Sequence, residues 1–172
     1  LDRLERHFYT TSSCGVCGKA SLDSLRVAGQ VSMADLPGEF AADMFLGLPA
    51  RVRLHQPVFA ETGGLHAAAI FGPDGEIDIV REDVGRHNAT DKVIGAFLEQ
   101  DRIPGHQKGL FVSGRASFEL MQKSVVAGIP LLAAVGAPSS LAVETGREFG
   151  MTLVGFLRDG TFNIYTGAER IK

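Results

Sequence analysis

The chain has 172 residues, of which 45% are hydrophobic and 22% charged, and its formal net charge at pH 7 is −3. This length suits one compact domain with a sizeable core, and the composition is that of an ordinary globular protein. The slightly acidic balance does not favour binding to a nucleic-acid backbone or to an anionic membrane. Because the longest apolar runs are too short to cross a bilayer, we expect a cytoplasmic protein without nucleic-acid or membrane partners.

The first 35 residues hold the only two cysteines, Cys14 and Cys17, in the stretch TTSSCGVCGKAS. Weak periodicity and many Ser, Thr and Gly residues predict a mobile amino-terminal segment over 1–35, with the cysteines in a loop. Residues 36–172 are expected to form the α/β core of the same single domain. Two cysteines do not make the disulfide framework of a secreted protein, so they are expected to be reactive thiols.

Apolar residues at helical spacing over 36–59 predict two short helices, with Pro37 and Pro49 near their starts. The runs LHAAAIF and EIDIVRE flank the turn GPDG, a pattern typical of a β-hairpin. An amphipathic helix is expected over 86–100, because one helical face collects apolar residues, namely Ala89, Val93, Ile94, Phe97 and Leu98.

The second half of the chain alternates between buried strands and helices. Strands are predicted at 109–113 and in IPLLAAV, each followed by a helix, and MTLVGFLRDGTFNIYT is a final strand or a pair turning at Asp159-Gly160. Strand, helix, strand, helix, strand in this order implies a parallel part of the sheet. The expected fold is a three-layer α/β/α sandwich with a mixed sheet.

Three turns are expected at the carboxyl ends of the strands, where open α/β sheets bind ligands: EDVGRHNA, VSGRAS and VGAPSS. They place arginines and hydroxyl groups at helix starts, in Arg86, Ser113, Arg115, Ser117, Ser139 and Ser140. Free N–H groups and guanidinium groups favour a phosphate or another anion, and three such turns together favour a nucleotide pocket. The plainer alternative is that the serines cap helices and the arginines are surface charges. A Walker A or GxGxxG stretch is missing, which excludes an ordinary P-loop or dinucleotide fold.

The stretch FLRDGTFN, residues 156–163, allows two interpretations. An Asp-Gly pair between strands is typical of an ordinary hairpin turn. The same turn could also place Arg158 and backbone amides against a ligand.

The cysteine pair leaves four alternatives open. A structural zinc site needs four ligands, and none of the five histidines forms an H-x(3–5)-H pair. A redox role is disfavoured because the strand and helix order is not that of thioredoxin, although Lys19 could favour a thiolate. A sulfur carrier needs an accessible thiolate that holds sulfur as a persulfide, which suits a loop. Inert buried cysteines fit the polar setting poorly.

Six motifs in register resemble the formate dehydrogenase accessory sulfurtransferase family, often called FdhD. They are SSCGVCGKAS, ETGGLHAAAIF, REDVGRHNATDKVIG, VSGRASFELMQK, APSSLAVE and LVGFLRDGTFNIYT. The resemblance implies a sulfurtransferase that receives persulfide sulfur from a cysteine desulfurase and passes it to the molybdenum (or tungsten) bis-molybdopterin guanine dinucleotide cofactor, for formate dehydrogenase. It also implies that Cys14 carries the persulfide and that Cys17 is its partner.

The resemblance further assigns the cofactor contact to the segment Phe156, Leu157, Arg158, Asp159, Gly160 and Thr161. An anionic guanine dinucleotide agrees with a pocket at the turns, so we expect it to meet Arg86, His87, Ser113, Arg115, Ser139 and Ser140 as well. The cofactor is bound as a substrate, and no structural metal is expected. A cofactor-binding chaperone that transfers no sulfur is the alternative function.

The family is also said to share the cytidine deaminase fold. Deaminases bind zinc through an H-x-E helix and a P-C-x-x-C helix. This chain has His87-Asn88-Ala89 at the first position and SGRASFEL at the second, so it lacks the glutamate and both thiolates. We therefore expect the scaffold without deaminase chemistry. Family members extend further at the amino terminus, a region this chain is expected to lack, and the apolar helices at 36–59 leave a face for a homodimer.

Overall fold

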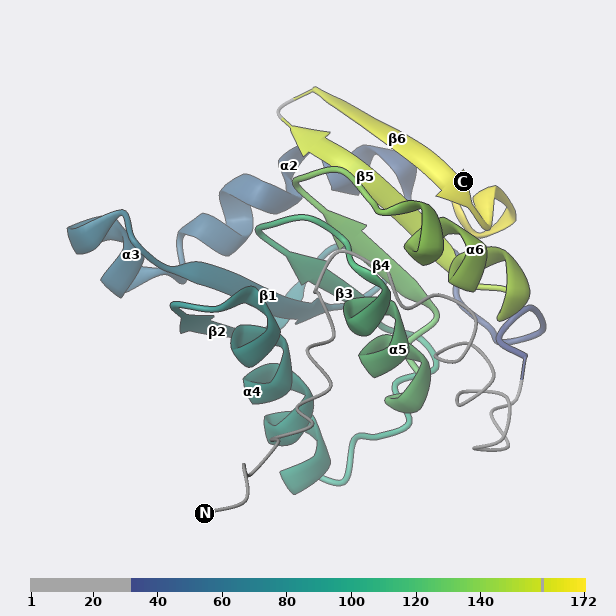
Figure 1. The fold of residues 1–172 in the computed structure, drawn as a ribbon, viewed down its shortest axis with the longest axis horizontal. Helices are drawn as coiled ribbons and strands as arrows, with labels where there is room; N and C mark the ends of the chain where they lie inside the picture. Colours follow the sequence, from purple (N-terminus) through teal and green to yellow (C-terminus); the bar gives the residue numbers. More distant parts are fainter. Residues whose placement is uncertain (1–31, 159) are drawn as a thin grey trace, which may run out of the picture.

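The computed structural model describes residues 32–158 and 160–172, and its centre is a six-stranded sheet in the order β2-β1-β3-β4-β5-β6 (Figure 1). The strands β3, β4 and β5 run parallel, whereas β1 is antiparallel to β2 and β3, and β6 is antiparallel to β5. Their bounds are β1 His66–Phe71, β2 Ile77–Asp83, β3 Gly109–Val112, β4 Leu131–Ala134, β5 Thr152–Arg158 and β6 Thr161–Thr166. The predicted hairpin, parallel portion and closing strand pair are thus confirmed.

Helices cover both faces of the sheet. Figure 1 shows α4, α5 and α6 in front of it and α2 behind, which makes the predicted three layers. The helices are α2 Ala42–Arg53, α3 Pro57–Thr62, α4 Arg86–Glu99, α5 Phe118–Val126 and α6 Ser140–Glu148, with a 3₁₀ turn η1 at Ala168–Arg170. No helix in the described part of the chain is long and apolar enough to span a bilayer.

Each face of the sheet has its own hydrophobic core, and β1 shows how the two are divided. Its side chains alternate, so that Ala68 and Ile70 join the core under α4, α5 and α6, while Ala69 and Phe71 join the core under α2. Small alanines on this inner strand let α4 approach one face of the sheet closely. Both cores consist almost wholly of side chains with no exposed surface.

Two details of the predicted helices are wrong. Pro49 lies inside α2 rather than near a helix start, and it is Pro57 that begins α3. Pro49 has no N–H to donate to the carbonyl of Phe45, four residues earlier in α2. On α4 the apolar face is narrower than predicted, because Leu98 is 62% exposed.

The register brings the ends of four strands and the starts of two others to one edge. His66 at the start of β1 pairs with Asp83 at the end of β2, and Ala68 pairs with Val112 at the end of β3. At the far side of the sheet, Arg158 at the end of β5 pairs with Thr161 at the start of β6. This carboxyl edge therefore collects the turns that the sequence predicts to bind a ligand.

The opposite edge is held by Arg170, whose side chain is 4% exposed. Its guanidinium donates to the carbonyl of Gly150 at 2.8 Å and to the carbonyl of Met33. Met33 is itself buried, and its N–H donates to the carbonyl of Phe149 at 2.8 Å. Met33, near the beginning of the described residues, is therefore fixed to the end of α6.

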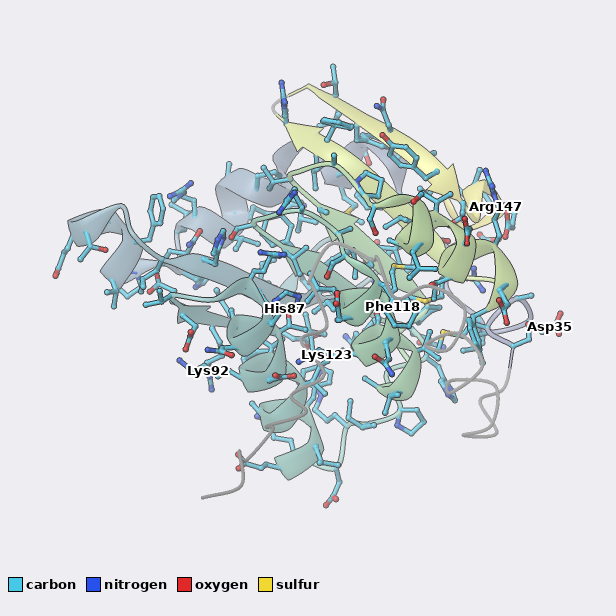
Figure 2. The ribbon with its side chains drawn as sticks, in the orientation of Figure 1. Asp35, His87, Lys92, Phe118, Lys123 and Arg147 are labelled. Carbon is cyan, nitrogen blue, oxygen red and sulfur yellow. The ribbon has the colours of Figure 1, made fainter. Side chains whose placement is uncertain are left out.

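We expect Arg170→Ala to lower the free energy of unfolding by about 2–3 kcal/mol, because it leaves buried carbonyl groups without their charged donor. Urea denaturation at pH 7 measures this change. Arg147→Ala is the matched control, since Arg147 is exposed on α6 (Figure 2) and its loss should change stability by less than about 0.5 kcal/mol. Equal losses in the two variants would contradict the role given to Arg170.

Candidate functional site

The loops that follow β3 and β4 continue to pair after the strands end. The N–H of Gly136 donates to the carbonyl of Gly114 at 2.9 Å, and the N–H of Ser139 donates to the carbonyl of Ala116 at 2.9 Å. A side chain at Gly136 would lie 3.0–3.1 Å from Arg115, so glycine favours the close approach of the two loops. The pairing places the starts of α5 and α6 side by side.

A pocket of about 130 Å³ lies at these helix starts, and we call it the arginine pocket. Two cations face it, Arg86 from the first residue of α4 and Arg115 from the loop before α5. Neither guanidinium has an ion pair within the described residues, and the Nε atom of Arg86 is buried without a hydrogen-bond partner. The full lining is Arg86, Arg115, Ala116, Ser117, Ala137, Pro138 and Ser139.

Helix termini add to the positive character of the arginine pocket. The N-cap residues of α4 and α5, Gly85 and Ser117, make no capping hydrogen bond through a side chain to the first turn of their helix, so these helices present free N–H groups. Ser139 does cap α6, because its Oγ accepts from the N–H of Ala142 at 3.2 Å. Free N–H groups and the helix dipole both favour an anion at this position.

His87 lies beside the arginine pocket, near the amino-terminal end of α4 (Figure 2). Its Nε2 atom is 3.1 Å from the hydroxyl oxygen of Ser117 and 4.0 Å from a carboxylate oxygen of Glu119. Burial lowers the pKa of His87 below 6.5, and the charge of Arg86 lowers it further. The imidazole is therefore mostly neutral at pH 7, and it meets the arginine pocket through Ser117, which is part of the lining.

Two nearby carboxylates, Asp83 and Glu82, are engaged elsewhere and do not neutralise the arginines. Asp83 lies 2.6 Å from the ammonium group of Lys92 and accepts from the N–H of Gly85 at 3.0 Å. The hydrogen bond from Gly85, with that from Lys92, lowers the pKa of Asp83 to about 2. Glu82 accepts the first N–H groups of α3, from Val58 and Phe59.

The segment before the β5–β6 turn adjoins the arginine pocket through Phe156. This residue has φ 52, in the left-handed region that a bulky side chain rarely adopts, and its N–H donates to the carbonyl of Gly136 at 3.1 Å. The guanidinium of Arg158 is exposed and lies 5.8 Å from the Phe156 ring centroid. Leu157 is buried in the core under α2, so only its backbone can meet a ligand.

The other predicted residues are spread along the same edge or fall outside it. Ser113 does not line the arginine pocket, since its Oγ accepts from the N–H of Ala67 at 2.9 Å. Ser140 is exposed at the start of α6, and Gly160 and Thr161 are exposed at the turn. The predicted sites Cys14, Cys17 and Asp159 lie outside the described residues.

Two residues at this edge have no counterpart in the sequence predictions. Glu119 approaches His87 from the first turn of α5, and His66 contacts Ser113 through its Nδ1 atom at 3.2 Å. In the sequence, His66 is marked only by its position at the start of the predicted hairpin. Its place at the edge that holds the site follows from the antiparallel pairing of β1 with β2 and β3.

The FdhD/NarQ family matches the chain over residues 1–172. The chain belongs to the FdhD/NarQ family. It is 61% identical to the sulfur carrier protein FdhD of Mycolicibacterium paratuberculosis over 166 residues, which cover 96% of this chain and 61% of that protein.

More distant family members are also similar to nearly the whole of this chain. The sulfur carrier protein FdhD of Saccharolobus solfataricus is 45% identical over 166 residues, 96% of this chain and 62% of that protein. A crystal structure from Desulfotalea psychrophila, provisionally described as a formate dehydrogenase accessory protein, matches with a TM-score of 0.75 and 26% identity, over 90% of this chain and 62% of the other. The chain thus spans about three fifths of the length of these FdhD relatives.

We expect the pKa of His87 to rise in Arg86→Gln, which removes a nearby cation, and to fall further in Glu119→Gln, which removes a nearby anion. Histidine NMR titrations of the three proteins measure these shifts. Because the pKa of His87 is lower in the folded state than in the unfolded chain, stability is highest above pH 6.5 and falls as pH drops from 6.5 through the lower folded pKa. Shifts of the same sign in both variants would contradict the geometry described.

Proposed function

We propose that this chain is a sulfur carrier that takes sulfur from a cysteine desulfurase and passes it to a molybdenum or tungsten bis-molybdopterin guanine dinucleotide, in support of formate dehydrogenase. The observation that carries the proposal is the arginine pocket, where Arg86 and Arg115 lack carboxylate partners in the described residues. Family membership supplies the chemical context, because curated relatives are named sulfur carrier proteins.

The arginine pocket suits the phosphate groups of such a substrate. Guanidinium groups bind phosphate oxygens with two parallel hydrogen bonds, and helix N–H groups bind the remaining oxygens. With a volume of about 130 Å³ the pocket is small, so it fits a phosphate group rather than a whole nucleotide. The adjoining Phe156 and Arg158 would then meet the rest of the ligand.

The cysteines supply the sulfur chemistry. The thiolate of Cys14 attacks the outer sulfur of the desulfurase persulfide, a new S–S bond forms on Cys14, and the desulfurase cysteine leaves as a thiolate. Transfer onward breaks the bond between Cys14 and the outer sulfur. The acceptor supplies the electron pair, and Cys14 returns to a thiolate, with Cys17 assisting by thiol exchange.

We expect the desulfurase, supplied with cysteine, to load one sulfur atom onto Cys14. Intact-protein mass spectrometry would show an adduct of about +32 Da, the mass of one added sulfur atom in persulfide chemistry, that Cys14→Ala abolishes. Cys17→Ala is the matched control, because it keeps the carrier thiolate and should still be loaded. The same adduct on Cys14→Ala would contradict the assignment.

Guanosine diphosphate should bind the protein about a hundredfold more weakly after Arg86→Gln/Arg115→Gln, because two charge-assisted hydrogen-bond donors are lost. Isothermal titration calorimetry measures the dissociation constants. Arg147→Gln is the matched control, since it removes an exposed arginine from the carboxyl-terminal turn of α6, away from the pocket. Equal weakening in the control would mean that net charge, not the pocket, governs binding.

A chaperone that binds the cofactor without sulfur transfer is the second candidate. It is favoured by one observation: neither cysteine is among the described residues that line the arginine pocket. Formate dehydrogenase activity in cells that carry Cys14→Ala/Cys17→Ala separates the candidates, because a chaperone would still support activity and a sulfur carrier would not.

A further inference from the structure

Ser117 connects the arginine pocket to the imidazole ring of His87. Its side chain is buried and belongs to the lining of the pocket, and its hydroxyl oxygen lies 3.1 Å from the Nε2 atom of His87. His87 itself is not among the described residues that line the pocket. Any effect of the ring on a ligand in the pocket is therefore transmitted through the hydroxyl of Ser117.

Glu119 approaches the same ring from the first turn of α5. One of its carboxylate oxygens lies 4.0 Å from Nε2 of His87, and this oxygen is buried without a hydrogen-bond partner in the described residues. The Nε atom of Arg86, the residue before His87, is also buried without such a partner. Buried charged atoms normally have partners, because they lose their hydrogen bonds to water. His87 thus lies near one incompletely paired anion and one incompletely paired cation.

The charged groups that face His87 come from the two helices α4 and α5. They are Arg86 and Asp91 on α4, and Glu119 and Lys123 on α5. Figure 2 shows His87 and Lys123 on these neighbouring helices. Asp91 and Lys123 form an ion pair with each other, so their effects on the ring oppose and largely cancel. Arg86, which disfavours a proton on the ring, and Glu119, which favours one, therefore decide its charge.

The strands β1 and β2 also pack against α4, and their titratable groups at this edge make other contacts. Asp83 is paired with Lys92, and Glu82 accepts from the first N–H groups of α3. His66 contacts the hydroxyl oxygen of Ser113. An anion bound beside Arg86 is therefore the event that would change the balance of charge at His87.

The contact between His87 and Ser117 can run in two directions. A neutral Nε2 atom can accept the hydroxyl proton of Ser117, whereas an imidazolium ring donates from both nitrogens and leaves that hydroxyl proton free to meet another acceptor. An anion in the pocket offsets the positive charge of Arg86 and so favours a proton on the ring. By linkage, the proton strengthens the binding of the anion by the same factor.

We propose that an anion in the arginine pocket draws a proton from solvent onto His87, and that the charged ring, held by Glu119, turns the hydroxyl of Ser117 from the ring to the anion. One N–H bond forms, the proton comes from water, and no other covalent bond of the protein or the anion changes. His87 is thus a positioning residue that acts on the ligand through Ser117. The coupling rests on the proposed function, which places a phosphate group in the pocket.

Sulfate is a suitable probe, because it has the tetrahedral shape and the charge of a phosphate dianion but takes up no proton near neutral pH. Histidine NMR titrations in sodium sulfate, and in sodium chloride of equal ionic strength, measure the pKa of His87 with and without the anion. We expect this pKa to be higher in sulfate. The internal control is His106, which is exposed in the loop before β3 and should have the same pKa in both salts. An equal pKa of His87 in the two salts, while the amide signals of Ala116 and Ser139 move with sulfate, would overturn the inference.

Three variants test the path from the ring to the anion. Sulfate should bind the unaltered protein about tenfold more tightly at about pH 5.5 than at about pH 8, and His87→Gln should remove this gain. Ser117→Ala should weaken binding at the lower pH only, because the neutral ring already engages the hydroxyl at the higher pH. His106→Gln is the matched control and should keep the gain.

The dependence on pH distinguishes this role from a merely structural one. A gain that persists in His87→Gln, or an equal loss at both pH values in Ser117→Ala, would overturn the inference. Should either variant fail to fold, the NMR titration of the unaltered protein still decides the outcome.

The same titrations separate the inference from the proposed function. If sulfate binds, depends on Arg86 and Arg115, and binds equally at both pH values, the coupling through His87 fails and the phosphate site of the proposed function stands. If sulfate moves no signal of the pocket at either pH, the phosphate site of the proposed function fails, and the coupling fails with it.

Discussion

The hydrogen bonds between the loops after β3 and β4 are the constraint on which the candidate site depends. They extend the parallel pairing past the strands, from Gly136 to Gly114 and from Ser139 to Ala116, so that α5 and α6 must begin beside one another. The lack of a side chain at Gly136 permits this approach. Because α4 begins next to the same edge, three helix starts lie around the arginine pocket. N–H groups at helix starts favour an anion bound there.

The charges at this edge are arranged so that the arginines stay unpaired. Asp83 is held by Lys92 and by the N–H of Gly85, and Glu82 is held by the first turn of α3. Both carboxylates therefore stabilise local structure instead of neutralising Arg86 or Arg115. A protein with a net charge of −3 can in this way present a local cationic site, which overall composition could not reveal.

Local pattern predicted most of the fold, because hydrophobic periodicity records which face of each element is buried. It misplaced Pro49, because α2 continues through this residue, and it could not show that Leu98 lies on the exposed side of α4. Sequence also brought Arg86, Arg115 and Ser139 to one place, because all three follow strands of one sheet. The contacts of Glu119 with His87 and of His66 with Ser113 were out of reach, because they depend on how α5 packs against α4 and on the register of β1.

Covalent geometry permits the cysteines to reach the pocket within one chain. Met33 is anchored beside the end of α6, and α6 begins at the arginine pocket, so the anchor lies about 14 Å away along a nine-residue helix. Fifteen residues lie between Cys17 and Met33, and a stretch of that length spans up to about 55 Å when fully extended. This maximum span is several times the length of α6, so chain length alone imposes no second subunit on the proposed transfer.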